Sequence, residues 1–288
     1  MIEVIEYKEG MEIKPPMFVA NMPDDVYHAW PDSISKSGLD LVHRSPAHYK
    51  YRGASKPSRA MEFGKALHCA VLEPDVFASR YLLLRHVSDR RVSEYKQAVA
   101  AKGEGNVLVS GEADQIAGIQ EVIASDFAVQ KLVSKPHWTE LSLFVNDPET
   151  GALVRVRYDM LTEDFEAVDL KTTQDCMPEA FAKSIAQYRY HVQAALYSDA
   201  FFWATGKPLA DFVFLAIEKE LPHARKLYTL DQESMRIGRV EYRKDMKVYY
   251  PAWEYDHWHG AEAEQVQSIS LPNWAFARFE EEIVEEIF

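Results

Sequence analysis

Three segments of the chain decide its fold: RVRYDML at 155–161, AVDLKTT at 167–173 and YRYHVQAALY at 188–197. The first two segments alternate apolar and polar residues, which is typical of β-strands, and the third has apolar residues at helical spacing. The sequence therefore predicts two neighbouring strands followed by a helix. Asp159 lies on the first strand and Asp169 on the second, so the strand pair can bring two carboxylates together.

The Asp169-Leu170-Lys171 tripeptide places an acid and a base on one face of its strand, because strand side chains alternate with a period of two. Magnesium prefers oxygen ligands and usually retains several waters, so two or three carboxylates can bind it. A lysine beside the ion can orient the attacking water or stabilise charge on a phosphate. Together with Asp159, this pattern makes metal-dependent phosphodiester hydrolysis the leading hypothesis. For an isolated Asp-x-Lys, a surface ion pair is the alternative.

Four further residues strengthen that hypothesis, although each also has an ordinary structural interpretation. His68 follows GKAL beside an apolar helical stripe, and Glu140 begins the strand that precedes Asp159. Gln193 and Tyr197 are four residues apart, so they share one helix face and can both donate to phosphate oxygens. The alternatives are a structural histidine, an exposed strand glutamate and two helix-surface residues.

The 288 residues, of which 47% are hydrophobic, suit one large domain spanning 1–288. Residues 1–31 are expected to form an extended lead-in and residues 251–288 an aromatic and acidic tail. The two cysteines, Cys69 and Cys176, indicate a reducing compartment and are too few for a four-cysteine zinc or iron–sulfur site.

No apolar run is long enough to cross a membrane, and the charged N-terminus lacks the apolar core of a signal peptide. These features predict a cytoplasmic protein.

The net charge of −13 counts against a nucleic-acid footprint spread over the whole surface. A metal ion adds local positive charge, however, and a groove can be basic while the outer surface is acidic. Much of the acidic excess lies in FEEEIVEEIF at 279–288, which is interpreted as a solvated helix face.

The order of the remaining elements predicts an α/β sandwich. Helices are expected at 61–72, 92–102, 110–134, 178–184, 188–204 and 232–250, and strands at 17–20, 138–145, 153–161, 165–171, 212–217 and 227–230.

These features resemble the PD-(D/E)xK nuclease superfamily, and within it the RecB-like branch with its trailing Q-x-x-x-Y helix. The closest resemblance is to the RecE (exodeoxyribonuclease VIII) C-terminal exonuclease family. Besides the three segments above, it rests on YHAWPDSISKSGLDLVHRSPAHYKY at 27–51 and AMEFGKALHCAVLEPDVF at 60–77, so it spans most of the chain.

The resemblance implies a restriction-endonuclease-like core, in which helices flank a central mixed β-sheet. It implies a magnesium-dependent exonuclease, with Mn²⁺ as a substitute, that digests duplex DNA from 5′ ends. The 3′ tails would serve a RecT-like annealing recombinase in DNA recombination and repair. Members of this family and their phage lambda-type relatives form rings around DNA, so a homotetramer is expected first and a trimer second.

Carried over by motif, the resemblance also implies roles for single residues. The metal ligands would be His68, Asp159, Asp169 and the Leu170 carbonyl, with Glu140 holding a second metal or a water. Lys171 would be the catalytic lysine, while Gln193 and Tyr197 would support the site and contact DNA. The candidate ligands of a terminal 5′ phosphate are Ser35, Lys36, Ser37, Arg44 and Arg59, which are basic or lie at helix starts. For the serines, simple helix capping is the alternative.

Three other functions stay open at this stage. One is a catalytically silent relative that binds DNA ends or recruits a recombinase, against which the intact Asp159, Asp169 and Lys171 argue. Another is an endonuclease of the same superfamily. The last is a structural or assembly protein, suggested only by the acidic tail.

Overall fold

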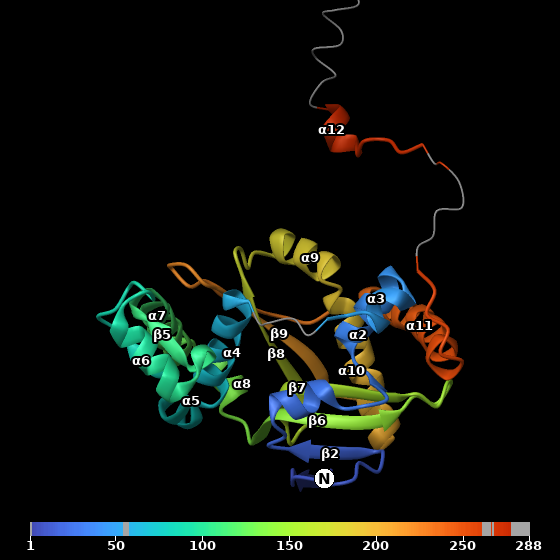
Figure 1. Cartoon of the computed structure of the whole chain (residues 1–288), viewed down its shortest axis with the longest axis horizontal. Coiled ribbons are helices and arrows are strands. Elements are labelled where there is room, and N and C mark those ends of the chain that lie inside the picture. Colours follow the sequence, from blue (N-terminus) through green and yellow to red (C-terminus); the bar gives the residue numbers. More distant parts are fainter. Residues whose placement is uncertain (1, 54–57, 261–265, 267, 278–288) are drawn as a thin grey trace, which may run out of the picture.

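A central mixed β-sheet dominates the computed structural model, which describes residues 2–53, 58–260, 266 and 268–277 (Figure 1). Within these residues the sheet has eight strands in the order β1-β2-β6-β7-β8-β9-β10, with β3 paired to β7. The strands are β1 Val4–Glu6, β2 Met17–Ala20, β3 Ser33–Ile34, β6 His137–Asn146, β7 Leu153–Thr162, β8 Glu166–Thr173, β9 Asp211–Glu218 and β10 Arg225–Tyr228.

Helices cover both faces of the sheet, as expected. They are α1 Asp24–Ala29, α2 Lys36–Arg44, α3 Pro46–Lys50, α4 Arg59–Leu72, α5 Pro74–Arg80, α6 Ser93–Lys102, α7 Ser110–Ser125, α8 Phe127–Val133, α9 Pro178–Gln187, α10 Tyr190–Thr205, α11 Gln232–Glu254 and α12 Asn273–Ala277. One hydrophobic core joins the sheet to α2, α3, α10 and α11, and a second joins it to α4, α7 and α8. None of the described helices is both long and apolar enough to cross a lipid bilayer.

Strands β8 and β9 run parallel between β7 and the edge strand β10 and are buried from both sides. Along β9, Phe212, Phe214 and Ala216 enter the first core, whereas Val213, Leu215 and Ile217 enter the second. Burial on both faces explains why FVFLAI reads as a continuous apolar run rather than as an alternating one.

Strands β6 and β7 form a long antiparallel hairpin whose turn is the DPETG segment at 147–151. The Asp147 carboxylate accepts hydrogen bonds from the backbone nitrogen and hydroxyl of Thr150, and Gly151 takes a φ of 78°. By contrast, β7 pairs with β8 only at Met160↔Val168 and Leu161↔Ala167, and the two strands separate beyond these pairs. We call this place the strand fork.

Three segments differ from the sequence-based expectation. The lead-in contains the predicted strand at 17–20 but also β1 and α1, and β1 extends the sheet beyond β2. The helix expected at 110–134 is divided into α7 and α8, because the carboxylate of Asp126 caps the backbone nitrogens of Ala128 and Val129. Helix α11 continues past Pro251, where an irregular tail was expected, because Tyr249 and Ala252 are buried on either side of the proline.

A small parallel sheet of β4 Leu82–Leu84 and β5 Val107–Val109 was not predicted. It has its own apolar cluster with Tyr95 and Ala98 of α6, beside α7 and α5 in Figure 1. The acidic run at 279–288 lies outside the described residues.

Candidate active site

Three carboxylates occupy one row across β6, β7 and β8. The ladder pairs that flank this row are Thr139↔Met160 and Leu141↔Tyr158 between β6 and β7, and Met160↔Val168 between β7 and β8. This register sets Asp159 opposite Glu140 on one side and opposite Asp169 on the other. The row lies at the strand fork, where the backbones of β7 and β8 no longer pair. The carboxylates of Asp159 and Asp169 therefore lie between two strands that have begun to separate.

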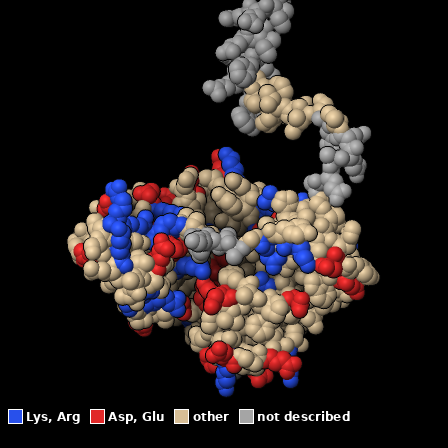
Figure 2. Space-filling model, in the orientation of Figure 1, with Lys and Arg blue, Asp and Glu red and all other residues tan. Residues whose placement is uncertain are grey.

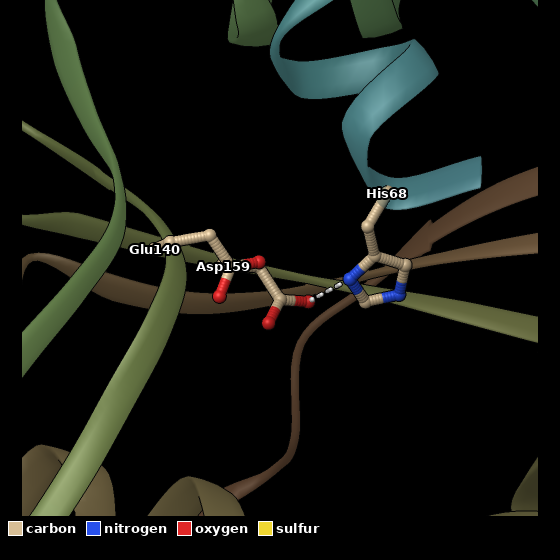
Figure 3. Close-up of side chains that lie close together, drawn as sticks. All are labelled: His68, Glu140 and Asp159. Atoms are coloured by element: carbon tan, nitrogen blue, oxygen red, sulfur yellow. Dashed lines mark ion pairs between the residues drawn. The ribbon is translucent and has the colours of Figure 1, made fainter. Parts of the chain in front are cut away.

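His68 of α4 reaches this row from the sheet face that α4 covers (Figure 3). Its Nδ1 lies 3.3 Å from Oδ2 of Asp159. His68, Glu140 and Asp159 each offer one ligand atom, and these atoms all lie within 4.8 Å of one another. Among the described residues this is the one group with metal-ligand spacing, so the structure brings together three of the predicted metal ligands.

The backbone of Glu140 is left-handed, with a φ of 45°, and its ladder pairing to β7 is interrupted. Residues other than glycine adopt this region rarely and at a cost, and they do so most often at functional sites. The conformation turns the Glu140 side chain toward Asp159 and His68, as Figure 3 shows.

Asp169 is deeply buried but lies outside the group of three. The amide Nε2 of Gln193 donates to its Oδ1 at 2.5 Å, and Nζ of Lys171 lies 2.6 Å from its Oδ2. The ammonium group of Lys171 is therefore the charged partner of this buried carboxylate. That Asp169 and the Leu170 carbonyl are metal ligands stays a prediction.

Burial, to which crowding of negative charge adds, raises the pKa of two carboxyls. Burial, together with the charge of Asp159, raises the pKa of Glu140 to about 8. Burial also raises the pKa of Asp159; His68 opposes this shift, and the charge of Asp169 adds to it. The backbone nitrogen of Leu170 donates to Oδ2 of Asp159 at 2.9 Å and lowers that pKa in part. The carboxylates therefore fit a divalent cation, which would relieve their repulsion.

Lys171 is the cation already in the row. Burial lowers the pKa of its ammonium group, but the charges of Asp169 and Asp159 outweigh burial and raise it. The group is therefore held protonated. Its Nζ also lies 4.6 Å from the centre of the Tyr190 ring.

Gln193 and Tyr197 of α10 both face the sheet. Gln193 positions Asp169 through its hydrogen bond. Tyr197 packs edge-on against Tyr158, with ring centres 5.4 Å apart, and its backbone carbonyl accepts from the Tyr158 hydroxyl at 2.8 Å. Burial raises the pKa of Tyr197 well above its usual value. The supporting role thus agrees with these positions, while contact with DNA stays a prediction.

The candidate phosphate ligands do not gather in one place. Ser35 caps α2 by accepting from the Gly38 backbone nitrogen at 3.2 Å, and its hydroxyl lies 3.1 Å from that of Ser37. Lys36 donates to the Tyr188 carbonyl at 2.7 Å and pairs with Asp40. Arg44 lies in the last turn of the same helix, about 13 Å from Ser35 along the axis at the usual helical rise.

Arg59 belongs to a different part of the molecule. Its guanidinium pairs with Glu62 and Glu112 and also donates to the Val107 carbonyl at 2.9 Å. The position of Arg59 thus gives no support to the role of a 5′-phosphate ligand.

Arg157 was not among the predicted site residues, yet it lies on the Glu140 side of the site. Arg157 donates to Asp24 at 2.7 Å and to the Met22 carbonyl at 2.9 Å, and one of its terminal nitrogens lies 3.9 Å from Oε2 of Glu140. Its position two residues before Asp159, on the same strand, is the signal that could have identified it.

The fold and the row of acids with a lysine define a PDDEXK-like protein. The chain belongs to the family described as "PDDEXK-like domain of unknown function (DUF3799)", which matches residues 35–272. The solved structure of a Eubacterium rectale protein named "Putative exonuclease" is similar, with a TM-score of 0.59 and 12% identity, covering 88% of this chain and 97% of that one.

A second solved structure, of a protein named SSO0001, has 14% identity and a TM-score of only 0.26 over 70% of this chain and 93% of that one. Such a score supports no conclusion about this protein. No curated protein sequence matches the chain.

Proposed function

We propose that this protein is a metal-dependent nuclease that hydrolyses phosphodiester bonds in DNA. The observation that carries the proposal is the convergence of Glu140, Asp159, Asp169, His68 and Lys171 at the strand fork. Membership of a PDDEXK-like family supports it, as does the fold shared with a protein named "Putative exonuclease".

The proposed metal is Mg²⁺, with Mn²⁺ as a substitute. His68, Glu140 and Asp159 would hold it, joined by Asp169 and the Leu170 carbonyl. A bound divalent cation would supply an activated water and neutralise charge on the phosphate.

The residues of the chain divide the remaining work among them. Lys171, held protonated by Asp169, supplies a fixed positive charge beside the substrate phosphate, where charge develops in the transition state. Because it is protonated, Lys171 acts as an electrostatic stabiliser or orients the water through a hydrogen bond. Gln193 positions Asp169, and Arg157 lies beside Glu140.

Our proposal for the substrate is linear duplex DNA, digested from 5′ ends to leave 3′ tails for a RecT-like annealing protein. The resemblance of the blocks at 27–51 and 60–77 to the RecE family supports this finer assignment. A ring-shaped homotetramer, or a trimer as second choice, would reconcile DNA binding with the net charge of −13, because only its channel needs to be basic. Figure 2 shows Lys and Arg on both sides of a central hollow that contains acidic residues.

The test uses linear duplex DNA labelled at the 5′ or the 3′ end, beside a closed circle, with Mg²⁺. Early release of 5′-terminal mononucleotides with the closed circle intact is expected. Cutting of the circle would instead indicate an endonuclease. No hydrolysis with Mg²⁺ or Mn²⁺ would refute the proposed activity and favour a DNA-end-binding relative. Asp159→Asn serves as the matched inactive control.

A further inference from the structure

A stacked pair of tyrosines lies directly beside Lys171. Tyr188 and Tyr190 have ring centres 5.6 Å apart and ring planes 27° apart. Nζ of Lys171 lies 4.6 Å from the centre of the Tyr190 ring. The tyrosine pair therefore lies next to the lysine that is proposed to face the substrate phosphate.

The outer tyrosine faces open space. Tyr188 is 53% exposed, and both rings line a cavity of about 680 Å³. The cavity extends along the end of β8, where Thr173 shares the strand face of Lys171, and along α9. Its volume is within the usual range for small-molecule and nucleotide pockets.

The turn between the two tyrosines is held by ion pairs of Arg189. Arg189 separates them and has a left-handed backbone, with a φ of 53°, which brings the rings together instead of sending them to opposite sides. Its guanidinium donates to Asp40 at 2.8 Å, to Glu241 at 3.1 Å and to Asp245 at 2.6 Å. These ion pairs offset the cost of the left-handed conformation.

The charged side chains that line the cavity are of both signs. Glu220 accepts a hydrogen bond from Gln115 and Asp175 accepts one from the Met177 backbone nitrogen, and both carboxylates stay negative because these donors are neutral. A base stacks through its uncharged ring, so the stacking itself needs no positive lining. Lys219 also lines the cavity, and its Nζ lies 5.9 Å from the centre of the Phe63 ring. Lys36 donates to the Tyr188 carbonyl at 2.7 Å and also pairs with Asp40.

We propose that Tyr188, supported by Tyr190, is a stacking platform for the base of the nucleotide whose phosphate lies at Lys171. A scattered exposed tyrosine needs no explanation, but this ring stacks on a second tyrosine that contacts Lys171. Stacking on an aromatic face accepts every base, so the platform would position a strand end without sequence preference. This inference rests on the proposed function.

The experiment measures binding without hydrolysis. The full chain is titrated with a short oligodeoxynucleotide that carries 2-aminopurine as its terminal base, in EDTA and in a second series with Ca²⁺. Tyr188→Leu keeps an apolar side chain but removes the aromatic face, and Tyr188→Phe keeps the face. Phe202→Leu is the matched control, because Phe202 is 52% exposed and lies about 18 Å farther along α10.

In the parent protein, stacking of the terminal 2-aminopurine on Tyr188 should quench its fluorescence. The expected result is that Tyr188→Leu weakens binding roughly five- to 150-fold and loses this quenching. Tyr188→Phe and Phe202→Leu should behave as the parent protein. An oligonucleotide with an abasic terminal site should lower the affinity of the parent protein to that of Tyr188→Leu and leave the variant unaffected.

Unchanged binding and quenching in Tyr188→Leu would overturn the platform while leaving the nuclease proposal intact. Failure of the parent protein to bind any oligonucleotide in either series would overturn the platform and also count against the proposed function. Hydrolysis of duplex DNA by the same preparation tells these two failures apart.

Discussion

The hydrogen bond between Gln193 and Asp169 offers the most direct test of how the site is held. Gln193→Ala removes a donor 2.5 Å from an oxygen of a carboxylate that is only 3% exposed. A hydrogen bond to a charged group contributes roughly 1.5–3 kcal/mol, and a buried acceptor left without its donor also loses its solvation. We therefore expect the free energy of unfolding to fall by about 1.5–3 kcal/mol.

The same change should weaken divalent-metal binding, because Asp169 would no longer be held in one orientation. Loss of a partner that orients a metal ligand typically costs roughly 10- to 100-fold in affinity or activity. Urea unfolding in EDTA measures the first effect, and calorimetric titration with Mg²⁺ or Mn²⁺ measures the second.

A matched control is Gln130→Ala, which removes a hydrogen bond of 3.1 Å to the Ile123 carbonyl in the α7–α8 turn. That variant should lose about 0.5–1.5 kcal/mol of stability and bind metal as the parent protein does. If Gln193→Ala unfolded at the parent urea concentration and bound metal equally well, Asp169 would not depend on Gln193, and the reasoning would be refuted.

Three further predictions concern the row of acids. Lys171→Ala should fold and bind metal but hydrolyse DNA orders of magnitude more slowly in single-turnover assays; full activity would exclude its proposed role. In EDTA, the raised pKa of Glu140, from 4.5 to about 8, should make the parent protein lose stability as the pH rises through this window. Glu140→Gln stays neutral, so its advantage in urea midpoint should be larger at about pH 9 than at about pH 5, and a constant difference would contradict the shift. Removal of divalent metal with EDTA should abolish hydrolysis, and readdition of Mg²⁺ should restore it; activity that persists in EDTA would reject the metal requirement.

The strands that carry the site could be predicted because their side chains alternate. The hairpin of β6 and β7 and the following strand β8 are found where the sequence changes to a period of two. By contrast, Leu82–Leu84 and Val107–Val109 are short apolar runs without a period, so neither could be recognised as a strand before its partner was known. The end of α7 depends on one capping side chain, Asp126, which left the apolar pattern unchanged.

The candidate site, like the fold, could be predicted only in part. The spacing of Asp159, Asp169 and Lys171 follows from strand geometry, and the structure places Glu140 in the same row. The separation of β7 from β8 could not be predicted, because the alternating pattern of each strand does not show where backbone pairing between them ends. The pairing of Tyr188 with Tyr190 could not be predicted either, since it requires a left-handed residue that is not a glycine.

The ion pairs of Arg189 indicate where substitutions outside the site would inactivate the protein. One side chain joins the turn before α10 to Asp40 of α2 and to Glu241 and Asp245 of α11. Helix α11 contributes none of the proposed metal ligands, yet substitutions at Asp245 would loosen the turn that holds the tyrosines. A screen for inactive mutants should therefore recover changes in this remote helix, and their defect should be weak retention of DNA ends in a protein that still binds metal.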